Sequence, residues 1–174
     1  MPEQQPKLLI RPALTVAVIS SKGDPSSVGE SIFPILYGAV YALKFQLKKA
    51  GVEDFKVTGL RARWPDSNLL PRSEWTAHWA LPIPDGTTHL PKHDQSTDIH
   101  IERWEYGMVA ELLHIGPYAA EGPTVDRLHR FIEESGFVIV GSHEEEYVTS
   151  PKAKTQKTLI RYIVSRVNTD PGTL

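Results

Sequence analysis

The chain has 174 residues, a formal net charge of −2, 40% hydrophobic residues and no cysteine. These values are typical of one globular domain, and the lack of cysteine excludes disulfides, thiolate nucleophiles and cysteine-ligated metal clusters. The balanced charge gives no reason to expect a nucleic-acid partner, and no apolar run is long enough for a signal peptide or a membrane span. We therefore expect a cytoplasmic protein that forms a single domain.

The first half of the chain carries the apolar patterns of a strand, a helix and two further strands. These elements are expected at residues 14–20, 31–49, 55–64 and 73–81. Pro34 lies inside the helical pattern, which is acceptable if the helix starts near Ser31 or if the proline kinks a longer helix. The polar, proline-bearing residues 1–12 are expected to form a flexible arm, and residues 82–97 a loop.

The second half repeats this order of elements. Strands are expected at residues 99–104 and 107–115, a helix at 125–135, and strands at 137–148 and 157–167. The order β-α-β-β therefore occurs twice, in halves at about 13–82 and 98–167, followed by a tail at 168–174. This duplication predicts an α+β fold with two helices on one face of a largely antiparallel sheet and a ligand cleft between the halves.

Residues 143–147, His-Glu-Glu-Glu-Tyr, form the most unusual local sequence. Alternate side chains of a strand share a face, so Glu145 and Tyr147 point one way while Glu144 and Glu146 point the other. Inside a cavity, desolvation would raise the pKa of the carboxyl group and make it a proton acceptor near neutral pH. On an exposed strand end, the same acids would simply be solvated.

The aromatic residues give a second signal. Tyr37 and Tyr41 are four residues apart on one face of the expected helix, and Trp75 and Trp79 share a face of one strand with Trp64 ending the strand before it. Core packing accounts for most aromatic residues of this kind. Four Trp and six Tyr in so short a chain also suit a pocket for a flat ligand.

The histidines and other motifs do not indicate a metal or a nucleotide. His89, His93, Asp94, Asp98 and His100 are close in sequence but lack a regular ligand spacing, and no phosphate-loop, GxGxxG or GxSxG motif occurs. We expect no metal and no cofactor. A further histidine, His114, stands beside a Gly-Pro-Tyr turn, where its ring can bond either the backbone or a ligand.

Several segments resemble the GyrI-like small-molecule-binding family: HIGPYAAEGPTVDRLHRFIEESGF, HEEEYVTSP, KTLIRYIV, GDPSS and LYGAVYALKFQLKKAG. The resemblance covers about residues 14–165 and implies a duplicated β-α-β-β (SOUL-like) fold with a ligand cleft between the halves. Relatives fused to a helix-turn-helix domain sense lipophilic, often cationic drugs. Because only about a dozen residues precede the first expected strand here, we expect no DNA-binding domain in this chain. The stand-alone branch is associated with detoxification, in which water opens the ring of cyclopropane-bearing cytotoxic compounds.

The family signature Glu-x-Tyr-x-x-x-Pro falls on Glu145, Tyr147 and Pro151. The resemblance therefore implies that Glu145 is the catalytic acidic residue, with Tyr147 beside it. The candidate ligand-binding residues, from the resemblance and the residue patterns together, are Tyr37, Tyr41, Trp64, Trp79, His114 and Tyr118. This sequence departs from the family in its additional acids Glu144 and Glu146, in Ser150 where relatives often have Asp, and in a shorter 82–97 loop.

Three functions fit these residues. In a hydrolase, Glu145 deprotonates a water, and Tyr147 or Tyr37 donates to the carbonyl that gains charge as the ring opens. In a non-catalytic multidrug-binding module, Glu145 neutralises a ligand cation that the aromatic rings surround. An adaptor that binds a partner such as a DNA topoisomerase would need an acidic surface at Glu144 and Glu146. In each case we expect no nucleic-acid or membrane partner, and the oligomeric state stays open.

Overall fold

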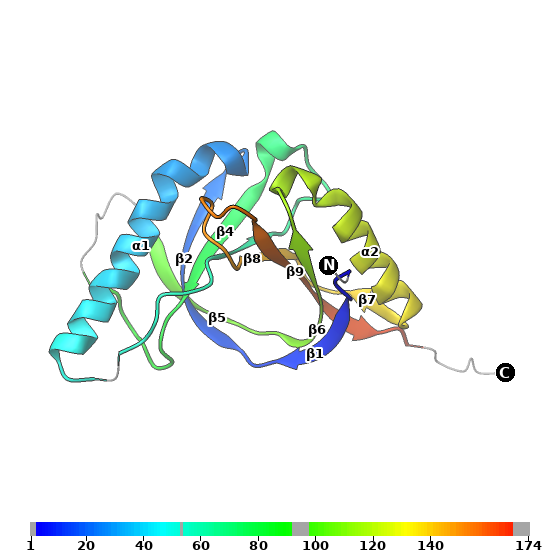
Figure 1. Ribbon diagram of the computed structural model, residues 1–174. Coiled ribbons are helices and arrows are strands. Elements are labelled where there is room, and N and C mark those ends of the chain that lie inside the picture. The colour runs from blue at the N-terminus through cyan, green and yellow to red at the C-terminus, as the bar shows by residue number, and fades with distance from the viewer. Residues whose placement is uncertain (1–2, 53, 92–97, 169–174) are drawn as a thin grey trace.

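A computed structural model describes residues 3–52, 54–91 and 98–168 of the chain. Within these ranges it contains one antiparallel sheet of nine strands and two α-helices (Figure 1). The strands are β1 (Lys7–Arg11), β2 (Leu14–Lys22), β3 (Arg61–Trp64), β4 (Thr76–Pro82), β5 (Ile99–Trp104), β6 (Gly107–Ile115), β7 (Phe137–Ile139), β8 (His143–Tyr147) and β9 (Lys157–Arg166). The helices are α1 (Pro25–Lys49) and α2 (Gly122–Glu134). The α+β class expected from the sequence is confirmed.

Both helices begin earlier than the apolar spacing predicts. Asp24 caps α1 by accepting a hydrogen bond from the Ser26 backbone N–H at 2.9 Å, so this helix begins at Pro25. Pro34 consequently lies inside a longer helix, where it has no N–H to donate to the preceding turn. The helix α2 includes Pro123 in its first turn, a position where a missing N–H costs little. In the described ranges, neither helix is long and apolar enough to cross a membrane.

The sheet curves until its two ends meet. Its strand order is β1-β6-β9-β8-β3-β4-β2-β5, with β7 paired to β9 beside this path. Arg11 pairs with Gly107 and Leu14 with Trp104, so the segments β1–β2 and β5–β6 run antiparallel to each other in one continuous register. The pair β1–β6 stands at one end of the strand order and the pair β2–β5 at the other, so the two ends of the sheet are joined through these continuous segments. The sheet therefore has an inner face, which surrounds an interior, and an outer face, which carries α1 and α2 (Figure 1).

Three expectations for the strands need correction. Residues 7–11, expected in a flexible arm, form β1 and pair with β6. Only the last four residues of the expected strand 55–64 are a strand, because Gly59 has a φ of +61° and the residues before it pack beneath α1 instead. The expected strand 137–148 is divided into β7 and β8, with Gly141 lying against Ile163 between them. Residues 92–97 and 169–174, part of the expected loop and tail, lie outside the described residues.

Two separate apolar cores lie on the outer face, one beneath each helix. Leu36, Val40 and Leu43 of α1 pack on Ala17, Ile19 and the neighbouring strands β3 and β4. Leu128 and Ile132 of α2 pack on β6 and β9. Figure 1 shows α1 and α2 on the same side of the sheet with β4, β8 and β9 between them. The strand β8 therefore lies at the seam between the two cores.

The inner face holds a buried network of ion pairs. Arg161 is 0% exposed and contacts three carboxylates: Glu111 Oε1 at 2.6 Å from its Nε, Glu146 Oε2 at 2.8 Å from its Nη2, and Glu144. Arg63 Nε donates to Glu144 Oε1 at 2.6 Å. These arginines compensate carboxylates that would be very costly to bury alone. Glu144 and Glu146 therefore point away from Glu145, as the strand alternation predicts.

We expect the Arg161→Leu substitution to lower the free energy of unfolding by about 3–5 kcal/mol, because it leaves Glu111 and Glu144 buried without their shared cation. Urea unfolding of the variant measures this loss. The matched control is Arg103→Leu, since the Arg103–Glu105 pair at 2.9 Å is exposed and should change stability by about 0.5 kcal/mol or less. Equal losses in the two variants would contradict the structural role of the network.

Candidate functional site

Alternation along β8 places His143, Glu145 and Tyr147 side by side on the outer face. Glu145 is 9% exposed, and both of its oxygens are hydrogen-bonded. Its Oε1 lies 2.8 Å from His143 Nε2, and its Oε2 accepts a hydrogen bond from the Tyr147 hydroxyl at 3.0 Å. The alternative that these acids are merely solvated at an exposed strand end is therefore wrong.

The strand β9 adds Tyr162 to this group. Its hydroxyl lies 2.5 Å from His143 Nδ1, so the imidazole links Tyr162 to Glu145. The ring centroids of His143 and Tyr162 are 5.3 Å apart, and the ring centroids of His143 and Trp64 are 5.8 Å apart. Hydrogen bonds and ring contacts together fix the orientation of the imidazole.

Glu121 is the second buried carboxyl group at this site. It precedes α2 and interacts with Glu145. Burial, the charge of Glu145 and hydrogen bonding with Glu145 raise the pKa of Glu121 to about 9, so this group holds a proton at neutral pH. Two carboxyl groups this close cannot both ionise at low cost.

Glu145 carries the charge of the pair. Burial alone would raise its pKa, but hydrogen bonds from His143, Glu121 and Tyr147 hold the pKa below its usual value. From the sequence alone, desolvation is expected to dominate and to raise the pKa of Glu145. The donors outweigh desolvation, and the group with the raised pKa is Glu121 instead.

A cluster of aromatic rings adjoins Glu145 through Tyr147, whose hydroxyl bonds this carboxylate. Trp79 stacks on Tyr147 at 6.4 Å, and Tyr118 meets Tyr147 edge-on at 5.6 Å. Trp64 meets Trp79 edge-on at 5.6 Å. Tyr118 is 37% exposed, which makes it the outermost ring of this group. The site therefore combines one buried negative charge, one acidic proton and several aromatic faces.

Three buried polar atoms at this site have no hydrogen-bond partner within the described ranges. They are the indole nitrogen Nε1 of Trp64, Oε1 of Glu121 and Oγ1 of Thr158. An unpaired buried donor or acceptor costs free energy in proportion to its lost hydration. An indole N–H, a carboxyl oxygen and a hydroxyl group at this site are thus without a bonding partner among the described residues.

The remaining candidate residues lie in different surroundings. Tyr37 is partly buried in the core beneath α1, and burial followed by the nearby Tyr41 raises its pKa. Tyr41 is 41% exposed and contacts Phe45 on its own helix. Neither tyrosine takes part in the hydrogen bonds or ring contacts described above for Glu145 and its neighbours. Their ligand-binding roles stay predictions.

His114 is buried and holds the turn before α2 in place. Its Nδ1 lies 2.8 Å from Thr124 Oγ1, and its Nε2 lies 3.0 Å from the Pro117 carbonyl oxygen. Both ring nitrogens are thus bonded within the protein. Of the two alternatives for this residue, contact with a ligand or with the backbone, the structure favours the backbone.

Sequence reasoning missed Glu121 and gave His143 and Tyr162 no role. Glu121 precedes Gly-Pro at the start of a helix, where an acidic residue usually serves only to complement the helix dipole. His143 stands within the motif itself, and Tyr162 shares an alternation pattern with Ile160 on β9. The pairing of β8 with β9 would have been the signal that brings His143 and Tyr162 together.

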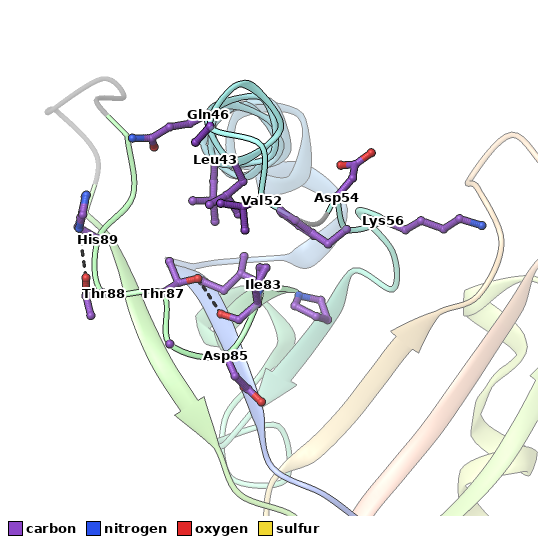
Figure 2. Close-up of a pocket in the computed structure, with 16 residues that line it drawn as sticks. Leu43, Gln46, Val52, Asp54, Lys56, Ile83, Asp85, Thr87, Thr88 and His89 are labelled. Carbon is purple, nitrogen blue, oxygen red and sulfur yellow. Dashed lines mark hydrogen bonds between the residues drawn. The ribbon is translucent and has the colours of Figure 1, made fainter.

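A separate hollow of about 760 Å³ lies between the end of α1 and the turn at residues 82–89 (Figure 2). Leu43, Val52 and Ile83 point into it, whereas Asp54 and Lys56 point away. None of the residues around Glu145 lines this hollow. The described part of the 82–97 loop thus borders this hollow and not the site around Glu145 and Glu121.

We expect Glu121→Gln to stabilise the protein at alkaline pH. A glutamate ionises near 4.5 when unfolded, while folded Glu121 keeps its proton up to about pH 9. The unfolded chain therefore releases a proton that the folded chain retains, and stability falls as pH rises through this window. Glutamine removes this dependence and keeps an N–H donor toward Glu145.

The expected gain for Glu121→Gln is about 4 kcal/mol larger at pH 8 than at pH 5, measured by urea unfolding. Glu133→Gln, on the exposed side of α2, is the matched control and should change stability equally little at both pH values. A gain of the same size at pH 5 and pH 8 would contradict a raised pKa at Glu121.

The chain is similar to several solved structures. An uncharacterized conserved protein from Listeria innocua has a TM-score of 0.82 and 26% identity, over 94% of both chains. A hydrolase from Listeria innocua has a TM-score of 0.79 and 26% identity, over 95% of this chain and 94% of that chain. The EcmrR C-terminal domain has a TM-score of 0.69 and 17% identity, over 94% and 99%, and shows similarity of fold alone.

No protein-family model matches the chain, and no curated protein matches it. The structural similarities agree with the nine-stranded antiparallel sheet and its two helices. The fold of this chain is thus an α+β fold consistent with the GyrI-like fold.

Proposed function

We propose that the protein binds lipophilic aromatic or cationic small molecules beside Glu145 and hydrolyses cyclopropane-bearing cytotoxic compounds by activating water at that glutamate. The observation that carries the proposal is the buried pair in which Glu145 is ionised and Glu121 is protonated, enclosed by aromatic rings. A proton acceptor and a proton donor that act together are what a water-addition reaction needs. The hydrolase from Listeria innocua, at 26% identity, supports this reaction class.

The proposed substrate is a cyclopropane ring conjugated to a dienone. The oxygen of a water molecule attacks a ring CH₂ carbon while Glu145 takes a proton from that water. The ring C–C bond breaks, and its electron pair moves into the conjugated system. The carbonyl oxygen gains this charge and takes the proton of Glu121, which yields a phenol with a hydroxylated side chain.

The carboxyl pair is then restored by one proton transfer. After the reaction Glu145 is protonated and Glu121 is ionised, and passing the proton between them returns the starting state. The net change is the addition of one water to the substrate. Because the pKa of Glu145 is lowered, its proton affinity is modest, and the strain of the three-membered ring supplies much of the driving force.

Glu121 is a better proton donor in this scheme than the tyrosines considered from the sequence. Tyr147 already donates to Glu145 at 3.0 Å, and burial followed by the Glu145 charge raises its pKa well above the usual value. A carboxylic acid with a pKa near 9 releases its proton far more readily than such a phenol. Tyr147 instead serves to hold the Glu145 carboxylate.

A non-catalytic multidrug-binding module is the second candidate function. It is favoured by the single negative charge of Glu145 among the faces of Trp79, Tyr147 and Tyr118, which suits an organic cation. Such a module would bind and sequester its ligand without turnover. The adaptor function is not supported, because Glu144 is buried in ion pairs with Arg63 and Arg161 and forms no acidic surface.

The test is incubation of the protein with a cyclopropane-containing dienone, with product identified by mass spectrometry. Ring opening by the wild type and a loss of about 10²–10⁴-fold in Glu145→Gln, with binding of the dienone retained, are the expected results. Saturable binding without product would establish the sequestering module instead. In that case Glu145→Gln should weaken binding of a cationic dye more than binding of a neutral one.

A control variant distinguishes the site from the separate hollow. Val52 lines that hollow and is 53% exposed, so Val52→Glu should leave both binding and turnover unchanged. Loss of binding in Val52→Glu, with no loss in the Glu145 variant, would place the ligand in the hollow and contradict the proposal.

A further inference from the structure

The contact between Tyr162 and His143 fixes where the protons of the site lie. The residue Tyr162 is 5% exposed. The one hydrogen bond that the structure describes for its hydroxyl joins it to His143 Nδ1, at 2.5 Å. Burial, followed by the charges of Glu145 and Glu121, raises the pKa of Tyr162, so the phenol keeps its proton. The hydroxyl proton therefore needs an acceptor close by.

Two arrangements of protons fit the distances. If the imidazole is neutral, Tyr162 donates to Nδ1, and the single ring proton sits on Nε2 and is donated to Glu145 Oε1 at 2.8 Å. If the imidazole is positively charged, Nδ1–H donates to Tyr162, and the phenol proton then has no acceptor among the described contacts. The neutral arrangement satisfies every donor, because each proton then has a partner.

The neutral arrangement has a consequence for the carboxyl pair. Glu145 receives one hydrogen bond on each oxygen, from His143 and from Tyr147. Glu121 has an oxygen, Oε1, that is buried and receives none in the described structure. Hydrogen bonds from donors stabilise a carboxylate over its acid, so the proton that the two groups share stays on Glu121.

We propose that Tyr162 and His143 are positioning residues that determine which of the two carboxyl groups is ionised. Tyr162 selects the imidazole tautomer that carries its proton on Nε2, and this proton holds the charge on Glu145. Without the Tyr162 hydroxyl, the other tautomer is accessible, and its Nε2 lone pair faces the Glu145 carboxylate. The assignment of base to Glu145 and acid to Glu121 then loses one of its determinants.

The proton assignment is tested without any substrate. In protein labelled with ¹⁵N-histidine, the two ring nitrogens give resonances that report whether each carries a proton. The expected wild-type result is a protonated Nε2 and a non-protonated Nδ1 at neutral pH. A proton on Nδ1 in the wild type would overturn the proposal, and this measurement does not depend on the folding of any variant.

The matched pair of variants is Tyr162→Phe and Tyr106→Phe. Tyr106 is also a buried tyrosine that donates to a glutamate, but its partner is Glu144 on the inner face of the sheet, at 3.1 Å. We expect Tyr162→Phe to shift the two His143 resonances toward a mixture of tautomers and Tyr106→Phe to leave them unchanged. Unchanged His143 resonances in Tyr162→Phe would overturn the proposal.

The catalytic consequence rests on the proposed function and is measured separately. With the cyclopropane-containing dienone, Tyr162→Phe should lower kcat by about 10–100-fold with little change in KM, while Tyr106→Phe changes neither. An unchanged kcat in Tyr162→Phe would overturn the positioning role. Lack of turnover by the wild type itself would contradict the proposed hydrolysis, while the ¹⁵N result would still decide the proton assignment.

Discussion

The ion pairs of Arg161 are the interaction on which the rest of this structure depends. The guanidinium group reaches Glu111 on β6 and Glu144 and Glu146 on β8, so one buried cation holds three strands together. Side chains alternate along β8, so Glu144 and Glu146 lie on one face of this strand and Glu145 on the other. The bonds of Glu144 and Glu146 to Arg161 hold β8 in place and thereby position Glu145. The position of the candidate site is thus set from the inner face of the sheet.

The acidic residues on the two faces of β8 lie in different electrostatic surroundings. On the inner face, arginines neutralise the carboxylates, and each charge has a permanent partner. On the outer face, Glu145 and Glu121 have no arginine among their described bonds and share one proton between them. The first arrangement stabilises the fold, since each of these carboxylates is bonded to an arginine. The second keeps a proton that can move, which is what acid–base chemistry requires.

Local pattern predicts much of this fold and one face of the site. The alternation in His-Glu-Glu-Glu-Tyr placed Glu145 with Tyr147 and Glu144 with Glu146. Apolar spacing located the ends of both helices to within one residue, but the start of α1 lies well before the expected Ser31. The start of α1 depends on the hydrogen bond of Asp24, which spacing does not report. The strand β1 is five residues long and exists through its pairing with β6, a contact about 100 residues away in sequence.

The rest of the site could not be predicted because it depends on which strands are neighbours. Arg161 alternates regularly on β9 and shows its role only when β8 lies beside it. Glu121 reaches Glu145 from the start of α2, a contact between segments that no spacing rule connects. The direction of the pKa shift at Glu145 likewise depends on donors from β8 and from the segment before α2. Long-range contacts therefore determine the chemistry of the site, whereas short-range sequence patterns determine where the helices and strands form.

The protonation states of Glu145 and Glu121 can be measured by a ¹³C NMR titration of the carboxyl groups in protein labelled with ¹³C-glutamate, with the resonances assigned by Glu121→Gln and Glu145→Gln. We expect that at pH 7 the Glu145 resonance is that of a carboxylate and the Glu121 resonance is that of a carboxylic acid, which titrates near pH 9. Two carboxylate resonances at pH 7, or a protonated Glu145 beside an ionised Glu121, would contradict this assignment.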